Sequence, residues 1–338
     1  MKKFLSVMFV TLLAVSAFAA DWGLYGSVRL QSYYENRDKY QSGLGESDTD
    51  LNFGLQGNSR VGAEVKVNEK FTANVELGVA GASDSNAVYT RLLYGTYDFG
   101  SFKLRIGQDY TPTDFEPFNQ VYYADNALDG FGGVSIGRSE QIKLMAGGFE
   151  LALVRNSTTG DPVHYDTVLP KIEVAYGFKV AGLDSRVFGG FETKKSEITD
   201  ETITNYIAGL GGTYSLSPVT VNFVAWYGQN TGDYGLVSNG TYDVANDENS
   251  KDFGGALEVG FEASKSLTFN VGYGYQRADR DDFTKADAQQ SYYANAIITI
   301  ADGFYVVPEV GVFDYMKDAN DNKEGKLTYF GAKWQMDF

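Results

Sequence analysis

The feature that most limits the possible folds of this chain is a two-residue alternation of apolar and polar side chains. In the final stretch, YFGAKWQMDF, one parity carries Phe330, Ala332, Trp334, Met336 and Phe338. Successive side chains of a β-strand point to opposite faces of its sheet, so this period is typical of strands whose two faces meet different surroundings. The same alternation recurs along most of the chain, and its abundance of Tyr, Phe and Gly also favours sheets over helices. The sequence therefore predicts an all-β fold.

About sixteen segments carry the alternation, which is within the range of transmembrane β-barrels. They lie at 22–34, 51–67, 71–80, 88–99, 102–110, 132–146, 149–156, 165–180, 185–195, 202–216, 219–229, 251–264, 267–278, 288–300, 304–316 and 326–338. Short turns, such as Gly100-Ser101 and Ser217-Pro218, alternate with long polar connections. The long connections are 35–50, 81–87, 111–131, 157–164, 196–201, 230–250, 279–287 and 317–325.

Short turns at one end and long loops at the other are typical of an outer-membrane barrel. Lipid offers the backbone no hydrogen-bond partner, so every strand must be paired and the sheet must close. A soluble β-sandwich is the alternative, but its inner face needs large apolar residues. The polar parity here is rich in Gly, Ser, Arg, Glu and Gln, which suit a water-filled interior better than a dry core. We expect an antiparallel transmembrane barrel of sixteen strands.

The N-terminal segment has the three parts of a secretory signal peptide. Lys2 and Lys3 precede an apolar stretch at 4–15, and Ala17-Phe18-Ala19 forms a small-x-small cleavage site. We therefore assign 1–19 to a signal peptide and 20–338 to one barrel domain. The chain has no cysteine and a formal net charge of −16, which argue against a disulfide scaffold and against a nucleic-acid partner.

Several segments resemble the trimeric general diffusion porins of Gram-negative outer membranes. The resemblance covers the whole mature chain in architecture, and it is most specific in five places. These are LYGSVRL at 24–30, NSRVGAEVKV at 58–67, TRLLYGTYDFGSFKLRIGQDYTP at 90–112, FGGVSIGR at 131–138, and the closing strand with Phe338. The resemblance implies a porin barrel in the outer membrane of a Gram-negative bacterium, with a third long loop that folds inward and narrows the pore.

In such porins, carboxylates of the third loop face arginines on the barrel wall. The loop at 111–131 carries Asp114, Glu116, Asp125 and Asp129. The matching wall residues are Arg60, Arg91 and Arg138, and Arg29 lies on the inward parity near a position where the family often has a basic residue. We expect these eight residues to form the pore constriction.

Strand parity supports an inward position for Arg29, Arg60 and Arg91. All three fall on the polar parity of their strands, and an arginine facing lipid at mid-membrane would cost about 2–4 kcal/mol. Opposed fixed charges across a narrow aqueous gap create a transverse field that selects solutes by charge and dipole. The alternative is that the arginines only pair with inward Glu64 or Glu76 and stiffen the wall.

The predicted function is a passive diffusion channel for small hydrophilic solutes and ions. A porin specific for a sugar or an anion is the first alternative, because several Tyr residues lie inward, and a structural or adhesive barrel is the second. Catalysis is not expected, because His164 is the only histidine and a Ser-His-Asp triad would depend on it alone. We expect no cofactor and no metal centre, since one His and no Cys leave little for zinc.

The resemblance also implies partners. A homotrimer is expected from the family, together with contacts to outer-membrane lipid and lipopolysaccharide. A terminal Phe after an alternating strand looks like the signal that the outer-membrane insertion machinery reads, so Phe338 is the candidate assembly signal. Nucleic acid is not expected as a partner.

Overall fold

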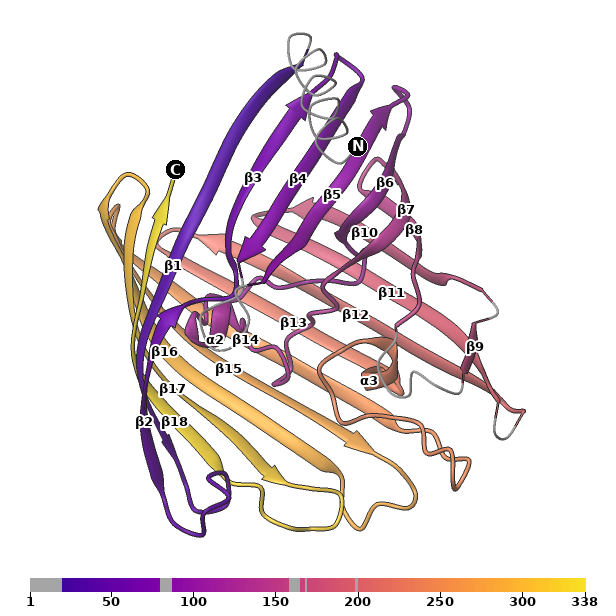
Figure 1. Ribbon diagram of the computed structural model, residues 1–338, viewed down its shortest axis with the longest axis vertical. Coiled ribbons are helices and arrows are strands. Elements are labelled where there is room, and N and C mark those ends of the chain that lie inside the picture. The colour runs from indigo at the N-terminus through magenta and orange to yellow at the C-terminus, as the bar shows by residue number, and fades with distance from the viewer. Residues whose placement is uncertain (1–19, 80–86, 158–164, 168, 198–199) are drawn as a thin grey trace, which may run out of the picture.

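The computed structural model describes residues 20–79, 87–157, 165–167, 169–197 and 200–338. Within these residues the chain forms a closed antiparallel barrel (Figure 1). The expected signal peptide, 1–19, and His164 lie outside the described residues. No helix in the described part of the chain is long and apolar enough to cross a membrane.

Eighteen strand segments make up the barrel in the described residues. They are β1 (Asp21–Arg37), β2 (Asp48–Leu55), β3 (Ser59–Lys66), β4 (Phe71–Val79), β5 (Val88–Asp98), β6 (Lys103–Tyr110), β7 (Arg138–Ala146), β8 (Phe149–Val154), β9 (Tyr165–Thr167), β10 (Lys171–Val180), β11 (Leu183–Ser196), β12 (Thr202–Leu216), β13 (Val219–Gln229), β14 (Lys251–Ser264), β15 (Leu267–Asp279), β16 (Asp287–Ala301), β17 (Phe304–Lys317) and β18 (Lys326–Asp337).

These segments correspond to sixteen barrel strands, because two strands are each divided in two. β2 and β3 both pair with β1, so together they form the single strand expected at 51–67. β9 pairs with β11, and β10 pairs with β8 and β11, so they share the strand expected at 165–180. The expected sixteen-stranded antiparallel barrel is therefore confirmed.

The barrel closes where the last strand meets the first. β18 pairs with β1 in an antiparallel register that includes Leu30 opposite Trp334. Phe338 extends this seam, because its backbone exchanges two hydrogen bonds with Gly26, at 2.8 and 3.1 Å. Closure leaves no free sheet edge at the seam, which is the arrangement that a lipid environment requires.

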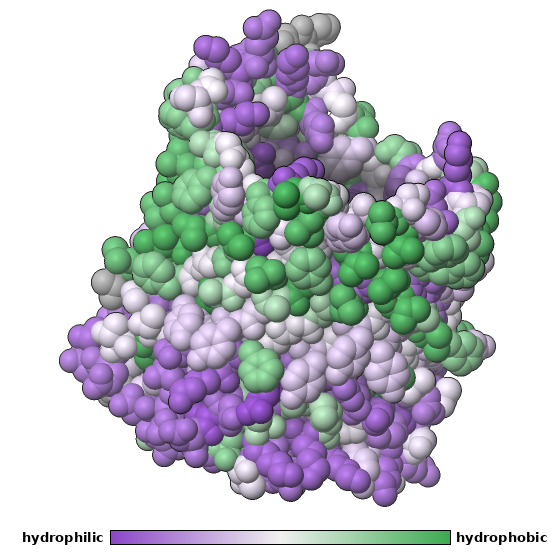
Figure 2. Space-filling model, turned by 180° about the vertical axis from the view of Figure 1, so that it is seen from behind, coloured by the Kyte–Doolittle hydropathy of each residue, from purple (hydrophilic) through white to green (hydrophobic). Residues whose placement is uncertain are grey.

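The outward face carries the apolar parity of the strands. Leu24, Val61 and Leu93 are exposed on this face, as are Trp334 and Met336 of the closing strand. Figure 2 shows a band of apolar residues across the molecule, with hydrophilic residues gathered below it at the end that bears the long loops. This distribution matches a barrel whose outside meets hydrocarbon along one zone.

One long loop folds into the barrel, and it is longer than expected. The sequence places a strand at 132–146, but β7 begins only at Arg138, so the inward loop spans 111–137. Gly132 and Gly137 have φ of 102° and 76°, a backbone conformation that an extended strand does not use. The carboxylate of Asp114 accepts the backbone N–H groups of Ile136 and Gly137, at 2.9 and 2.6 Å, and so closes the loop at its base.

The half of the interior opposite β1 to β6 contains a packed apolar cluster. Loop residues Phe118, Leu128 and Val134 lie there against inward side chains of the wall. The wall contributes Ala175, Phe188, Ile207, Val224, Trp226, Ala256 and Tyr293. The polar interior expected from the sequence is present in this half as buried Glu173, Glu192 and Glu258, and the apolar cluster that the loop covers lies among these polar groups.

A second long loop, 230–250, also enters this half of the barrel. Its short helix α3 (Thr231–Tyr234) is buried. Asp252 of β14 accepts the backbone N–H and the hydroxyl of Thr231, both at 2.8 Å, and the Lys171 ammonium donates to the Tyr234 carbonyl at 2.7 Å. The loop therefore supports the inward loop from behind, and its sequence shows only a long polar connection.

Candidate functional site

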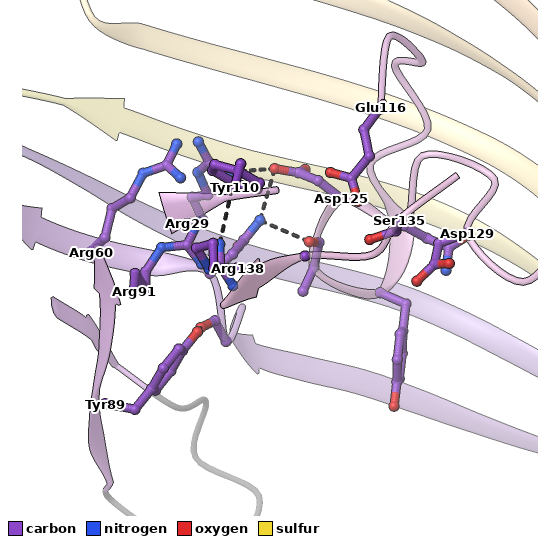
Figure 3. A pocket seen from close by; sticks show the side chains of 16 residues that line it. Arg29, Arg60, Tyr89, Arg91, Tyr110, Glu116, Asp125, Asp129, Ser135 and Arg138 are labelled. Carbon is purple, nitrogen blue, oxygen red and sulfur yellow. Dashed lines mark hydrogen bonds and ion pairs between the residues drawn. The ribbon is translucent and has the colours of Figure 1, made fainter. Parts of the chain in front are cut away.

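Four predicted arginines and three predicted carboxylates line one cavity of about 790 Å³ inside the barrel (Figure 3). Arg29 lies on β1, Arg60 on β3 and Arg91 on β5, and each projects from the inward parity of its strand. Arg138, at the start of β7, donates to the Tyr110 hydroxyl at 2.9 Å. Three strands on one side of the barrel, β1, β3 and β5, and the start of β7 therefore bring the guanidinium groups to one side of the cavity.

The break between β2 and β3 positions this basic wall. The Ser59 hydroxyl accepts the backbone N–H of Arg29 at 3.0 Å and donates to the Arg29 carbonyl at 3.1 Å. The break also turns two amide side chains toward the inward loop, where Gln56 donates to the Val121 carbonyl at 2.9 Å and Asn58 donates to the Ala124 carbonyl at 2.8 Å. The interruption thus connects the arginine wall to the loop tip.

Asp125 is the carboxylate that meets the basic wall directly. It accepts hydrogen bonds from the Arg29 guanidinium, from the Asn58 amide at 2.8 Å and from the Lys333 ammonium at 2.8 Å. Charge-assisted hydrogen bonds of this kind are stronger than neutral ones. Lys333 of β18 is a site residue that was not predicted, because only barrel closure places β18 beside β1.

The loop turn that presents Asp125 has an unusual backbone. It forms α2 (Tyr122–Asp125), a single turn in which Tyr123, Ala124 and Asp125 have φ of 54°, 64° and 61°. Non-glycine residues in the left-handed region cost about 1–3 kcal/mol each and persist only where the surroundings fix them. Hydrogen bonds from Gln56, Asn58 and Arg29 supply that fixation.

Glu116 and Asp129 complete the acidic side of the cavity (Figure 3). Both belong to the inward loop, outside the strands. Burial raises the pKa of Glu116, and burial together with the nearby Glu116 charge raises the pKa of Asp129 to about 8. Asp125 is the carboxylate of these three that directly contacts two cations, Arg29 and Lys333.

The fourth predicted carboxylate, Asp114, is placed differently. Its contacts are with the backbone N–H groups of Ile136 and Gly137 at the loop base, and burial raises its pKa well above the ordinary value. It joins the two ends of the inward loop, whereas the other three carboxylates face the cavity. Sequence spacing could not separate these roles, because a loop has no periodicity that assigns its side chains to faces.

Part of the arginine wall is paired within the wall itself. The Arg91 guanidinium contacts Glu76 at 2.5 Å, and that of Arg60 lies 3.7 Å from the same carboxylate. The pairing of wall arginines with Glu76, which was the alternative interpretation of these residues, is therefore present in the structure. It does not remove the arginines from the opening, since Arg29, Arg60, Arg91 and Arg138 all line the cavity.

Three glutamates of the opposite wall hold the loop by its backbone. Glu173 accepts the N–H of Thr113 at 3.0 Å, and Glu258 accepts that of Asn119 at 2.7 Å. Glu309 accepts two consecutive N–H groups, those of Val121 at 2.8 Å and Tyr122 at 2.9 Å. An irregular loop inside a barrel must satisfy its backbone polar groups, and these buried carboxylates provide acceptors.

Among the described residues, no group of three or more His, Cys, Asp or Glu side chains is arranged to hold a metal ion. The arrangement is instead a cavity with arginines on one side and carboxylates on the other. Such an arrangement can orient water and favour solutes by charge and dipole as they pass.

Comparison with solved structures places the fold among outer-membrane channels. The outer-membrane channel DcaP of Acinetobacter baumannii aligns with a TM-score of 0.75 and 20% identity, over 95% of this chain and 98% of that one. The loop L8 deletion mutant of OmpT, an outer membrane protein of Vibrio cholerae, aligns with a TM-score of 0.67 and 17% identity, over 95% and 100%. The anion-selective porin from Comamonas acidovorans aligns with a TM-score of 0.64 and 12% identity, over 94% and 100%.

No protein-family model matches the chain, and its sequence finds no significant match among curated proteins. The likeness to solved structures is therefore one of fold at low identity. The chain adopts the porin fold: a sixteen-stranded antiparallel barrel with a loop folded into its interior.

Proposed function

We propose that this protein is an outer-membrane porin, a passive diffusion channel for small hydrophilic solutes and ions. The observation that supports this most directly is the charged cavity in which wall arginines face Asp125, Glu116 and Asp129 of the inward loop. It lies inside a closed barrel whose outer face is apolar, so a solute that crosses the bilayer through the barrel passes between these charges.

In the proposed mechanism, the loop sets the size of the passage and the charges set its preference. Packing against the apolar half keeps the loop on one side, so the aqueous path lies along β1, β3 and β5. Solutes there meet a transverse field between guanidinium groups and carboxylates. No chemical step is involved, and we propose no catalytic activity.

An assembly of three copies in a Gram-negative outer membrane is part of the proposal. OmpT of Vibrio cholerae, one of the solved structures with this fold, is described in a trimer form. Contacts with outer-membrane lipid and lipopolysaccharide follow from the apolar belt and the polar loops. Phe338, which extends the β1–β18 seam, is proposed as a signal for the insertion machinery. Cross-linking of the detergent-extracted protein tests the trimer. If only the monomer band appears on the gel, the trimer is rejected.

Planar-bilayer recording of the purified protein tests the channel. We expect stable ohmic conductance steps, and replacing Arg60, Arg91 and Arg138 together by Gln should make the channel more cation-selective. One unit charge about 5 Å from the ion path contributes about 0.8 kcal/mol at the dielectric constant of water, so the permeability ratio should change by at least about fourfold.

The matched control is Arg155→Gln, because Arg155 is exposed and pairs with Glu140 outside the cavity. Its permeability ratio should stay at the wild-type value. Folded protein without conductance would reject the channel and favour a structural or adhesive barrel. If the triple variant conducts with the same ion selectivity as the wild type, the role of these arginines is rejected.

A further inference from the structure

Asp125 lies between two cations that belong to opposite sides of the barrel seam. One of its carboxylate oxygens accepts a hydrogen bond from the Lys333 ammonium of β18, at 2.8 Å, and the other accepts one from the Arg29 guanidinium of β1. Both cations are largely buried, with 8% and 10% of their side chains exposed. Because β1 and β18 are paired, both cations stay beside the same carboxylate, and this group of three has one positive charge in excess.

A second group of the same kind lies on the same wall. The Glu76 carboxylate of β4 contacts the guanidinium groups of Arg91, at 2.5 Å, and Arg60, at 3.7 Å. None of the ion pairs in the described residues involves Arg138, which donates to the Tyr110 hydroxyl. Two groups of two cations and one carboxylate, with Arg138 in addition, leave three positive charges in excess.

The remaining carboxylates of the cavity do not cancel this excess. Glu116 and Asp129 are the other two acidic residues that line it (Figure 3). One positive charge remains in excess even when both are ionised, and burial raises the pKa of each of them, which lowers their negative charge at neutral pH. The charged cavity is therefore net positive, although the chain as a whole has a formal net charge of −16.

The positive excess continues from the loop base toward the short turn between β5 and β6. Asp109 of β6 lies between Arg105, at 2.5 Å, and Lys143 of β7, at 2.9 Å. This third group again has two cations for one carboxylate. Glu64 lines the same cavity as Arg105, so the preference for one sign is weaker here than in the charged cavity.

The cavity on the long-loop side of α2 has the opposite balance. Glu35, Asp129 and Glu324 line it, together with Arg37, whose guanidinium donates to Glu35 at 2.5 Å. It has a volume of about 1100 Å³, against about 790 Å³ for the charged cavity, so ions and water have more room there. Coulomb energies fall with distance, and 0.1 M salt screens exposed charges over about 10 Å. We therefore expect the charged cavity to set the selectivity.

We infer that the channel selects small anions over cations, and that Lys333 determines part of this preference. Lys333 is not among the residues that line the charged cavity, so it acts through Asp125. By pairing with Asp125 it offsets the negative charge that would otherwise attract cations to the passage. The inference rests on the proposed channel function and goes beyond it, because that function leaves the sign of the selectivity open.

Reversal potentials of the reconstituted protein in a KCl gradient at neutral pH test the inference. We expect the wild type to pass Cl⁻ more readily than K⁺. Lys333→Gln should shift the permeability ratio toward K⁺ by up to about fourfold, the value for one unscreened charge about 5 Å from the path. Lys333→Arg should retain the wild-type ratio, because it keeps the charge.

Lys326→Gln is the matched control. Lys326 lies on the same strand as Lys333 and also pairs with an aspartate, Asp314, at 2.9 Å, but neither residue lines the charged cavity. The permeability ratio of Lys326→Gln should equal that of the wild type.

A double variant separates the charge of Lys333 from a merely structural role. Asp125→Asn and Lys333→Gln, made singly, should shift the ratio in opposite directions. Made together, they remove one charge of each sign, so the ratio should return close to the wild-type value. If Lys333 only keeps the loop in place, the double variant stays as far from the wild type as Lys333→Gln, and the role of Lys333 in selectivity is overturned.

The wild-type measurement decides the sign independently of any variant. A preference for K⁺ overturns the inference while the channel function stands. A preference for Cl⁻ that Lys333→Gln leaves unchanged rejects the role of Lys333. Folded protein that carries no current rejects the channel function itself, and the inference with it.

Discussion

The two halves of the barrel interior treat the same loop in opposite ways. On the side of β10 to β16, the inward loop is bound by apolar packing, with Leu128 and Val134 fully buried. On the side of β1 to β5, it meets arginines across a cavity, and its contacts there are charged or polar, apart from the ring of Tyr122, which meets the Tyr33 ring of β1 edge to face. The two halves therefore have separate roles. One half fixes the position of the loop, so in the other half the loop carboxylates and the wall arginines can stay apart across the cavity.

Energetics explain why the fixing half must be apolar. Full burial of a Leu, Val or Phe side chain contributes about 1.5–3 kcal/mol. The ion pairs of Asp125 with Arg29 and Lys333 are largely buried, so the cost of removing their charges from water offsets much of the attraction. The three backbone-binding glutamates add direction to this packing, since each accepts an N–H group from a particular loop residue.

The largest expected effect comes from breaking the apolar half with one side chain. Gly274 of β15 lies against the loop so closely that a Cβ there would overlap the carbonyl oxygen of Phe131. We expect Gly274→Val to displace the loop, because overpacking costs about 1–3 kcal/mol, which raises the undocked population about 5- to 150-fold. Single-channel recordings should show larger and noisier conductance, and proteinase K should cleave within 111–137.

Gly54→Val is the control for this change. Gly54 lies on β2, and nothing lies within 4 Å of a Cβ placed there. The control should conduct quietly and resist the protease. If Gly274→Val behaves in the same way, the loop is not held by the apolar half.

A smaller effect should follow from a change in the charged half. Asp125→Asn removes the carboxylate that contacts Arg29 and Lys333, while the contacts of the loop with the apolar wall remain. The passage should become more anion-selective, by up to about fourfold in the permeability ratio for one unscreened charge about 5 Å from the path. Reversal potentials in a salt gradient measure the shift.

Protease resistance separates this prediction from the first one. The Asp125→Asn loop should remain uncleaved, because Leu128 and Val134 stay packed. Cleavage at the wild-type rate together with altered selectivity would support separate roles for the two halves. Rapid cleavage would show that the charged contacts also hold the loop.

The alternation in the sequence predicted the strands because lipid and lumen impose different chemistry on the two faces. It missed the break at 56–58, since apolar residues keep their parity on both sides of it. It also did not predict the apolar cluster inside the barrel, although β13 carries Val224 and Trp226 on its inward parity and Phe223 and Tyr227 on the other. Apolar residues on both parities are the mark of a strand covered on both faces, and this signal was available.

The positions of the candidate site residues were predictable in part. Parity placed Arg29, Arg60 and Arg91 in the lumen, because lipid excludes guanidinium groups. The separate roles of Asp114 and Asp125 depend on loop conformation, including the left-handed turn at Tyr123, and no local pattern encodes that. The contact between Lys333 and Asp125 joins residues 208 positions apart in the chain, so it exists only once the barrel closes.

The smallest predicted effect is a pH dependence confined to the charged half. The raised pKa of Asp129, about 8, means that this carboxyl is largely neutral below pH 7 and gains its charge as the pH rises toward 9. The channel should therefore become more cation-selective between pH 6 and 9, by less than the change that Asp125→Asn produces. Asp129→Asn should remove most of this pH dependence and should barely alter selectivity at pH 6. Asp125→Asn should retain the pH dependence, because Asp129 remains, and a flat wild-type profile would show that Asp129 is already ionised at neutral pH.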